Sequence, residues 1–323
     1  MVLEGLLSTH SLRRHAFFMT LFSFIVSSVA LWTAYFTFPT HASILAIAFI
    51  TIGTVPVIYK IFAEAEHIQE RLENKLVIHR YLIAIYGFLS LGIILSFIAW
   101  YMILPDQSSN VCLTSDICIN GISKDTFFSE QIKTLGGIEN LRAKLTGNVT
   151  ALVSCGSSSG CWFDVIFFNN LTIIVLAIVF SILYGSGAIF LISWNSSVVA
   201  IAIAERLNAM QHFAFLGFLP HGIPEFVGYF SAAIAGGLFS AMIVRHRLKK
   251  IVAVHMIMEI MVFVMLALIS ILVGAIIESY IIIGNQEIPT VLSALYIIGL
   301  ILFGLGIRKK DSYHYEPRRR FSL

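Results

Sequence analysis

Long apolar runs separated by short polar segments set the pattern of this chain. Most of the runs approach or exceed the ~18–20 residues that a helix needs to cross the hydrocarbon core of a bilayer. They cover residues 16–38, 43–62, 81–104, 165–194, 221–244, 251–283 and 288–307. The first run is longer than the apolar region of a signal peptide, which has about 7–15 residues, so we interpret it as a retained helix. The pattern predicts an all-α polytopic transmembrane helical bundle.

The segment 195–219 does not fit this simple pattern. It holds a short apolar stretch, then the adjacent charged residues Glu205 and Arg206, then aromatic residues up to Pro220. We expect this segment to cross the membrane as a broken or short helix that carries Glu205 and Arg206 at membrane depth. A re-entrant helix over 221–244 is the alternative. The expected count is therefore about 7–8 membrane segments.

The composition excludes a water-soluble globular protein. Of the 323 residues, 58% are hydrophobic and only 12% are charged, whereas soluble domains are roughly half apolar and about a quarter charged. The mean hydropathy of the chain is +0.88. The formal net charge of +3 is too small to indicate a nucleic-acid partner. The partner that the composition predicts is the lipid bilayer.

The basic residues are concentrated on one side of the expected bundle. The N-terminus, the connectors 60–80 and 245–250, and the tail hold 16 of the 21 Lys and Arg residues. Basic residues near membrane ends favour the cytoplasmic side. We therefore expect both termini in the cytoplasm and the insert 105–164 outside it.

This reasoning divides the chain into four regions. They are N-terminal membrane helices with a charged cytoplasmic connector (1–104), an extracytoplasmic insert that contains the cysteines (105–164), a second membrane core (165–307) and a basic cytoplasmic tail (308–323).

All four cysteines lie in the insert. Cys112 and Cys118 precede a helix-like stretch over 124–145, and Cys155 and Cys161 follow it. Four cysteines allow three disulfide connectivities: one within each pair, and two crossed ones that would tie the ends of the insert together. A zinc site is the competing interpretation, but two C-x5-C pairs do not match the usual C-x2–4-C spacing. On an oxidising side of the membrane we expect disulfides.

Three sets of ionisable side chains fall within the apolar segments, where a charge is costly and indicates function by default. The sets are Glu205 with Arg206, the i,i+4 pair His221 and Glu225, and Glu278. A rise of 1.5 Å per residue along two antiparallel helices puts Glu278 at a similar depth to His221 and Glu225, near the outer boundary. The helices on which these residues lie should therefore bring them together.

Three roles remain open for His221, Glu225 and Glu278. They could form a hydrogen-bonded lock at the start of a helix, bind a metal or substrate, or transfer protons. No HExxH zincin motif is present. We expect no catalytic residue, no resident metal and no cofactor.

The order of these elements resembles the stage II sporulation protein M family of integral membrane proteins over residues 169–283. The residues that carry the resemblance are Pro220-His221-Gly222-Ile223-x-Glu225, the small-residue stretch 232–237 and Gly274-Ala275-Ile276-Ile277-Glu278. The motif residues that match directly are His221, Gly222, Glu225 and Glu278. Asn195 also matches, but Ser196 follows it where the family usually has Gly. The resemblance makes 165–307 the family-like membrane core.

The resemblance implies a plasma-membrane protein. In spore-forming bacteria the family works at the engulfing membrane as an organising subunit, beside enzymes that remodel peptidoglycan. We therefore expect a non-enzymatic membrane scaffold or assembly subunit with protein partners, and we leave homo-oligomerisation open. The alternative is a transporter or channel that handles substrate or protons at His221, Glu225, Glu205 and Glu278.

Overall fold

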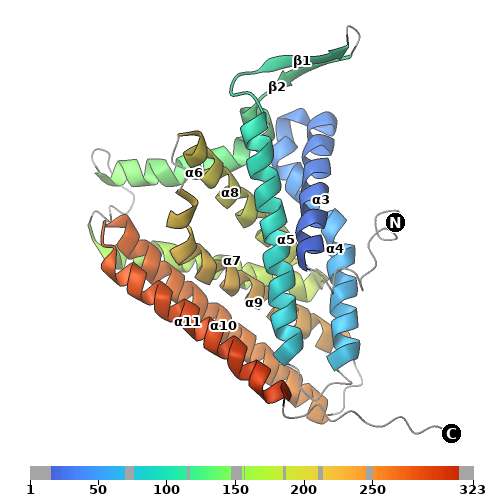
Figure 1. Cartoon of the computed structure of the whole chain (residues 1–323), viewed down its shortest axis with the longest axis vertical. Coiled ribbons are helices and arrows are strands. Elements are labelled where there is room, and N and C mark those ends of the chain that lie inside the picture. Colours follow the sequence, from blue (N-terminus) through green and yellow to red (C-terminus); the bar gives the residue numbers. More distant parts are fainter. Residues whose placement is uncertain are drawn as a thin grey trace, which may run out of the picture.

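The computed structural model of the chain describes residues 16–69, 76–114, 117–146, 155, 157–184, 187–209, 214–244 and 250–312. Within these ranges the protein is a helical bundle with one small β-hairpin (Figure 1). Seven helices of this described part are long and apolar enough to cross a membrane. The prediction of a polytopic helical bundle is therefore confirmed.

The first three long helices agree closely with the apolar runs. They are α3 (Ala16–Thr37), α4 (Ala42–Gln69) and α5 (Leu76–Ile103). The connection between the first two is a short 3-10 helix, η1 (Pro39–His41). Helix α3 packs against both α4 and α5, and the three run along the long axis of the molecule (Figure 1).

The insert contains a hairpin that the apolar pattern did not predict. Strands β1 (Ser109–Thr114) and β2 (Ile117–Ile122) pair antiparallel and project beyond the helices at the top of Figure 1. The backbone register sets Cys112 opposite Cys118. The expected helix follows as α6 (Lys124–Thr146), and it packs on the bundle against α4 and α8.

The prediction of one span over 165–194 and a broken crossing over 195–219 is wrong. The chain instead forms two full helices, α7 (Ser159–Tyr184) and α8 (Ala188–Asn208). The boundary between them falls after Tyr184, inside the apolar run 165–194. A Cβ on Gly187 would lie 2.4 Å from the carbonyl oxygen of Phe180, so only glycine fits where the start of α8 meets the end of α7.

The observed bounds of α8 also correct the predicted position of Glu205 and Arg206. Both residues lie in the last turn of α8, not in the middle of a crossing. A short 3-10 helix, η2 (Ala214–Gly217), leads from that end into the next helix. The guanidinium of Arg206 sits over the ring of Phe218, 4.6 Å from its centroid.

The last three helices are α9 (Leu219–Val244), α10 (Lys250–Ile282) and α11 (Glu287–Ser312). Helix α9 packs along α10 and also against α7. Helices α10 and α11 lie side by side and cross Figure 1 diagonally, at a marked angle to α5. Gly284 turns the chain between them with a positive φ of 85°.

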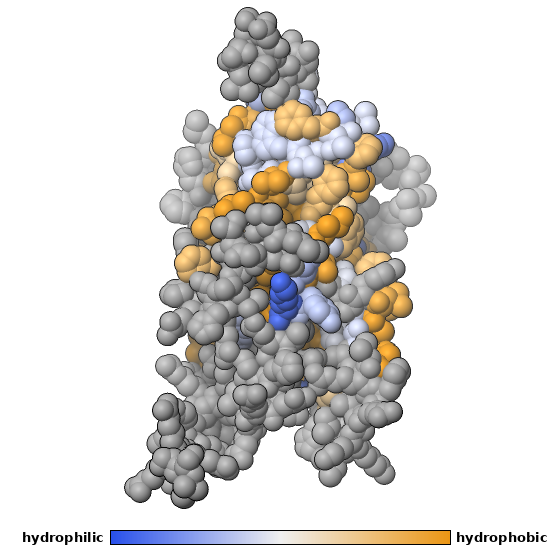
Figure 2. All heavy atoms as spheres, turned by 90° about the vertical axis from the view of Figure 1, so that its right-hand side faces the viewer, coloured by the Kyte–Doolittle hydropathy of each residue, from blue (hydrophilic) through white to orange (hydrophobic). Residues whose placement is uncertain are grey.

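The flank of the molecule has the surface expected of a membrane protein. Figure 2 shows mostly apolar side chains along the described part of this side, below a less hydrophobic rim at the upper end. Several sequence predictions lie outside the described residues. They concern the basic N-terminus, residues 70–75 of the charged connector, the basic residues 245–249 and the end of the tail.

Candidate functional site

A group of polar side chains joins α7, α9 and α10 inside the bundle. We call Asn170, His221, Glu225, Tyr229 and Glu278 the polar junction. The side-chain amide of Asn170 donates a 2.7 Å hydrogen bond to Glu225 Oε1. The Tyr229 hydroxyl donates a second 2.7 Å hydrogen bond to Asn170 Oδ1. Asn170 and Tyr229 are each only 4% exposed, so both ends of this amide are used where water is excluded.

Glu278 approaches the junction from α10. Its carboxyl interacts with that of Glu225 both electrostatically and through a side-chain hydrogen bond. A hydrogen bond between two carboxyl groups needs a proton on one of them. Two carboxyl groups from different helices therefore lie together next to the amide of Asn170.

Close helix packing brings the two carboxyl-bearing helices together. A Cβ on Gly274 of α10 would lie 2.8 Å from Glu225 Cγ and 3.4 Å from the His221 carbonyl oxygen. A Cβ on Gly228 of α9 would lie 2.9 Å from Ile271 Cγ2. Small residues at such contacts let helix backbones approach closely in a membrane. The glycines therefore determine how near Glu278 comes to Glu225.

His221 forms the edge of the junction. Its ring lies 6.0 Å from that of Phe218, centroid to centroid, and Arg206 acts on it electrostatically. The Nδ1 atom is buried and has no hydrogen-bond partner among the described residues. The end of α8 therefore brings one cation, and the start of α9 one imidazole, to the part of the bundle where Glu225 of α9 meets Glu278 of α10.

The other residues singled out from the sequence lie apart from this network. The side-chain amide of Asn195, in the middle of α8, donates to the carbonyl of Leu191 in its own helix. Glu205 acts electrostatically on Tyr101 of α5. A Cβ on Gly222 would meet nothing within 4 Å, so packing gives no reason for a glycine there.

Sequence reasoning missed Asn170 and Tyr229. Two signals could have found them: a carboxamide inside a long apolar run is unusual, and Tyr229 lies one turn after Glu225, on the same helix face. The partner of Asn170 could not be identified in this way, because nothing in the local pattern says which helices face each other.

A second cluster fixes the insert to the bundle. Its two anchors, Phe127 and Phe128 of α6, are 1% and 0% exposed. The residues around them are Trp32 and Tyr35 of α3 and Phe97 and Tyr101 of α5. We call these six residues the aromatic latch. The backbone of α6 leaves helical geometry at Phe128 (φ −126°, ψ 21°), where the two adjacent rings enter the bundle.

Polar contacts surround the aromatic latch. Lys124 pairs with Asp106 at 2.6 Å and lies 4.7 Å from the centre of the Tyr101 ring. Deeper along α6, Gln131 is fully buried and donates a 3.2 Å hydrogen bond to Ser197 of α8. The first half of α6 is therefore part of the folded core.

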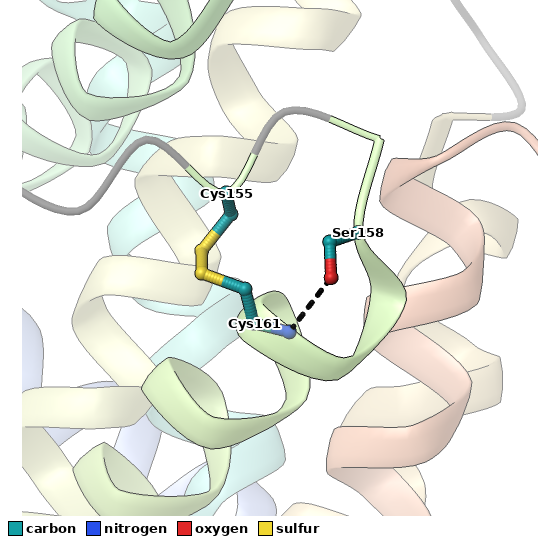
Figure 3. Close-up of a disulfide and its surroundings, with 3 residues drawn as sticks. All are labelled: Cys155, Ser158 and Cys161. Carbon is teal, nitrogen blue, oxygen red and sulfur yellow. Dashed lines mark hydrogen bonds between the residues drawn. A yellow bond between two sulfur atoms is a disulfide. The ribbon is translucent and has the colours of Figure 1, made fainter.

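A disulfide closes the other end of the insert. Cys155 is bonded to Cys161 in the first turn of α7 (Figure 3). The backbone N–H of Cys161 donates to the Ser158 hydroxyl at 3.4 Å, as in an N-cap. This pair matches the local connectivity. The side chains of Cys112 and Cys118 are outside the described part of the structure.

Comparison with known proteins adds one finding. The model of the family described as Stage II sporulation protein M matches residues 10–281. This match is much wider than the segment 169–283 that carried the resemblance, because it also includes α3, α4 and α5. No curated protein and no solved structure matches the chain.

Proposed function

The chain belongs to the stage II sporulation protein M family of multi-pass membrane proteins, and from this we propose that it is a non-enzymatic scaffold of the plasma membrane. In this role the membrane bundle anchors the protein and the insert recruits protein partners. In spore-forming bacteria the family works as an organising subunit, which supports an assembly role.

The observation that carries this proposal is the docking of the insert on the bundle. Phe127 and Phe128 are buried among aromatic residues of α3 and α5, and the Cys155–Cys161 disulfide ties the chain to the start of α7. The hairpin β1–β2 projects from this fixed base (Figure 1). A rigidly presented element loses little conformational freedom when a partner binds, which favours affinity.

We propose that the insert lies outside the cytoplasm and that both termini lie inside it. The disulfide supports this, because disulfides persist in oxidising compartments, and the distribution of Lys and Arg supports it independently. Alkaline phosphatase fused within the hairpin should be active, and the same enzyme fused after residue 323 should be inactive. The reverse pattern would contradict this orientation.

Removal of the hairpin tests the scaffold role without opening the core. Residues 110–121 would be replaced by Gly-Ser-Gly, because Phe127 and Phe128 must stay docked. The native protein would be purified from mildly crosslinked cells, and the proteins that accompany it would be quantified. We expect stoichiometric partners with the full chain and their loss with the shortened insert. Protein that purifies alone in both forms would contradict the proposal.

Two controls accompany this experiment. Cys112→Ser with Cys118→Ser keeps the length of the hairpin and should retain more of the partners than the shortened insert does. In the variant with the shortened insert, thermal unfolding and the protease resistance of α6 should match those of the full chain. A match would show that the aromatic latch stays packed.

The carboxyl pair favours a second candidate, a proton-coupled transporter. Glu225 and Glu278 interact inside the bundle beside His221, and buried carboxyl and histidine groups form proton relays in transporters. In proteoliposomes, Glu225→Gln and Glu278→Gln should abolish proton uptake. The matched control is Glu287→Gln, at the exposed start of α11. Uptake that survives both junction substitutions would remove these residues from the mechanism.

A further inference from the structure

One helix of the bundle presents a polar side chain to the membrane. Helix α7 has the smallest buried share of the seven candidate spans, 22%. Its outward side chains recur every three or four residues and so form one continuous stripe. The exposed residues of this stripe are Val165, Phe168, Asn169, Thr172, Val175, Leu176, Val179 and Leu183.

Asn169 stands near the middle of this stripe and of the span. The candidate span covers Ser159–Leu183, and Asn169 lies two residues from its centre, about 3 Å along a helix. Among the described residues of the seven spans, no other exposed carboxamide or ionisable side chain lies so near the middle of its helix. A carboxamide that faces hydrocarbon lacks the hydrogen bonds it had in water, and this costs free energy.

The exposed face of α10 has the composition expected of a helix face that contacts only lipid. Among its described side chains, the outward ones are Val254, Ile257, Met258, Met261, Val262, Met265, Ile269 and Leu272, which are all apolar. Thr172 of α7 also suits lipid, because its hydroxyl donates to the Phe168 carbonyl in the same helix. Asn169 differs, since its amide makes only a long 3.5 Å hydrogen bond to Asn170 Oδ1 in the part of the chain described here.

We propose that the exposed stripe of α7 is the contact between two copies of this chain, with the two Asn169 side chains hydrogen bonded to each other. A carboxamide is both donor and acceptor, so it is complementary to its own copy. Around a two-fold axis each residue near the axis meets itself, and parallel α7 helices would place Asn169 against Asn169. The apolar residues before and after it would then pack along the same seam.

The contact adjoins the polar junction. The Oδ1 atom of Asn170 accepts hydrogen bonds from Asn169 and from Tyr229, and its amide nitrogen donates to Glu225. Pairing of two copies would therefore draw Asn169 away from Asn170 and alter the hydrogen bonding of the junction. The inference deepens the proposed assembly role and rests on it, because it names one partner as a second copy.

Self-association in lipid vesicles tests the proposal. The full chain, labelled separately with donor and acceptor dyes at its C-terminus, would be reconstituted at decreasing protein-to-lipid ratios and followed by energy transfer. We expect Asn169→Leu to weaken association about tenfold, the value of one interhelical hydrogen bond in a membrane. Asn169→Gln should retain most of the association, and Met265→Leu on α10 should leave it unchanged.

Crosslinking locates the contact. Phe168→Cys and, as the matched control, Met265→Cys would be oxidised in the same vesicles, and we expect a crosslinked dimer only from Phe168→Cys. A monomeric full chain, association that Asn169→Leu does not weaken, or crosslinking only through α10 would overturn the inference. The inference would also be overturned if Asn169→Leu released a different bound protein from the chain purified from cells while self-association in vesicles stayed intact.

The scaffold role and the α7 contact can each be contradicted without the other. Partners that depend on the hairpin, together with a monomeric chain, would overturn only the α7 contact. A dimer that depends on Asn169 but recruits nothing in cells would contradict the scaffold while leaving the α7 contact standing.

Discussion

The aromatic latch and the polar junction hold the same bundle together by different means. The latch joins α6 to α3 and α5 with large rings, most of them almost fully buried, and Lys124 and Asp106 at its rim. The junction joins α7, α9 and α10 with two short hydrogen bonds, a carboxyl pair and glycines that allow close approach.

The difference follows from what surrounds each region. In lipid, burial of apolar surface gives no driving force between helices, so close packing and hydrogen bonds must join them. Phe127 and Phe128 belong to the insert, outside the candidate spans, so their burial removes two rings from water. The comparison predicts that the junction is sensitive to shape and hydrogen bonding, and the latch to lost side-chain volume.

Gly236→Val should give the largest effect, because it forces α7 and α9 apart. A Cβ at this position would lie 2.5 Å from Ser181 Cβ and 2.8 Å from the Ile178 carbonyl oxygen, so the backbone itself would have to move. We expect no folded protein, measured as loss of the monodisperse peak in detergent. Gly222→Val on the same helix has open space around it and should still fold.

Phe128→Ala should come next and tests the latch. A fully buried Phe truncated to Ala costs about 3–5 kcal/mol, here through lost contacts with Phe97 and Tyr101. The measurement is the free energy of unfolding in detergent, with proteolysis of α6 as a local probe. Phe36→Ala, at a ring that is 62% exposed, should cost far less. Equal losses of unfolding free energy in the two variants would contradict a stabilising role for the aromatic latch.

Asn170→Leu should have a moderate effect, because it removes a partner from Glu225 and from Tyr229 at once. Loss of a hydrogen bond to a charged or buried group costs about 1.5–3 kcal/mol. Tyr229→Phe alone should cost about 1 kcal/mol. The double variant should cost less than the two single losses added together, since both remove the same hydrogen bond. Strict additivity in a thermal-unfolding series would show that the network does not act as a unit.

Asp106→Asn should give the smallest effect. The side chain of Asp106 is 79% exposed, and an ion pair with one exposed partner contributes about 0–1 kcal/mol. The loss should shrink further in 0.5 M salt, because added ions screen exposed charges. A loss as large as that of Phe128→Ala would mean that the latch depends on this charge rather than on its rings.

The sequence predicted much of the element list and little of the packing. The runs over 16–38, 43–62 and 81–104 correspond to α3, α4 and α5, although α4 ends seven residues later and α5 begins five residues earlier than predicted. The prediction of a single span over 165–194 failed, because α7 ends and α8 begins within that run and the residues between them are few and not strongly polar. Counting residues along two antiparallel helices correctly placed Glu278 near Glu225. It could not identify Asn170 as their neighbour, since the local sequence does not say which other helix packs against these two.

By itself, the sequence determined that this chain lies in a membrane, where most of its long helices begin and end, and that His221, Glu225 and Glu278 are ionisable residues within apolar helices. A helix satisfies its own backbone hydrogen bonds, as hydrocarbon requires, and needs about 20 apolar residues to cross, so each span leaves a signature in its own local stretch. Only the tertiary structure decided that Asn170 is the amide that joins Glu225 and Tyr229, that Phe127 and Phe128 lock the insert, and that Asn169 faces outward. These facts depend on which helix faces meet, and shape and close packing between residues distant in the chain decide that.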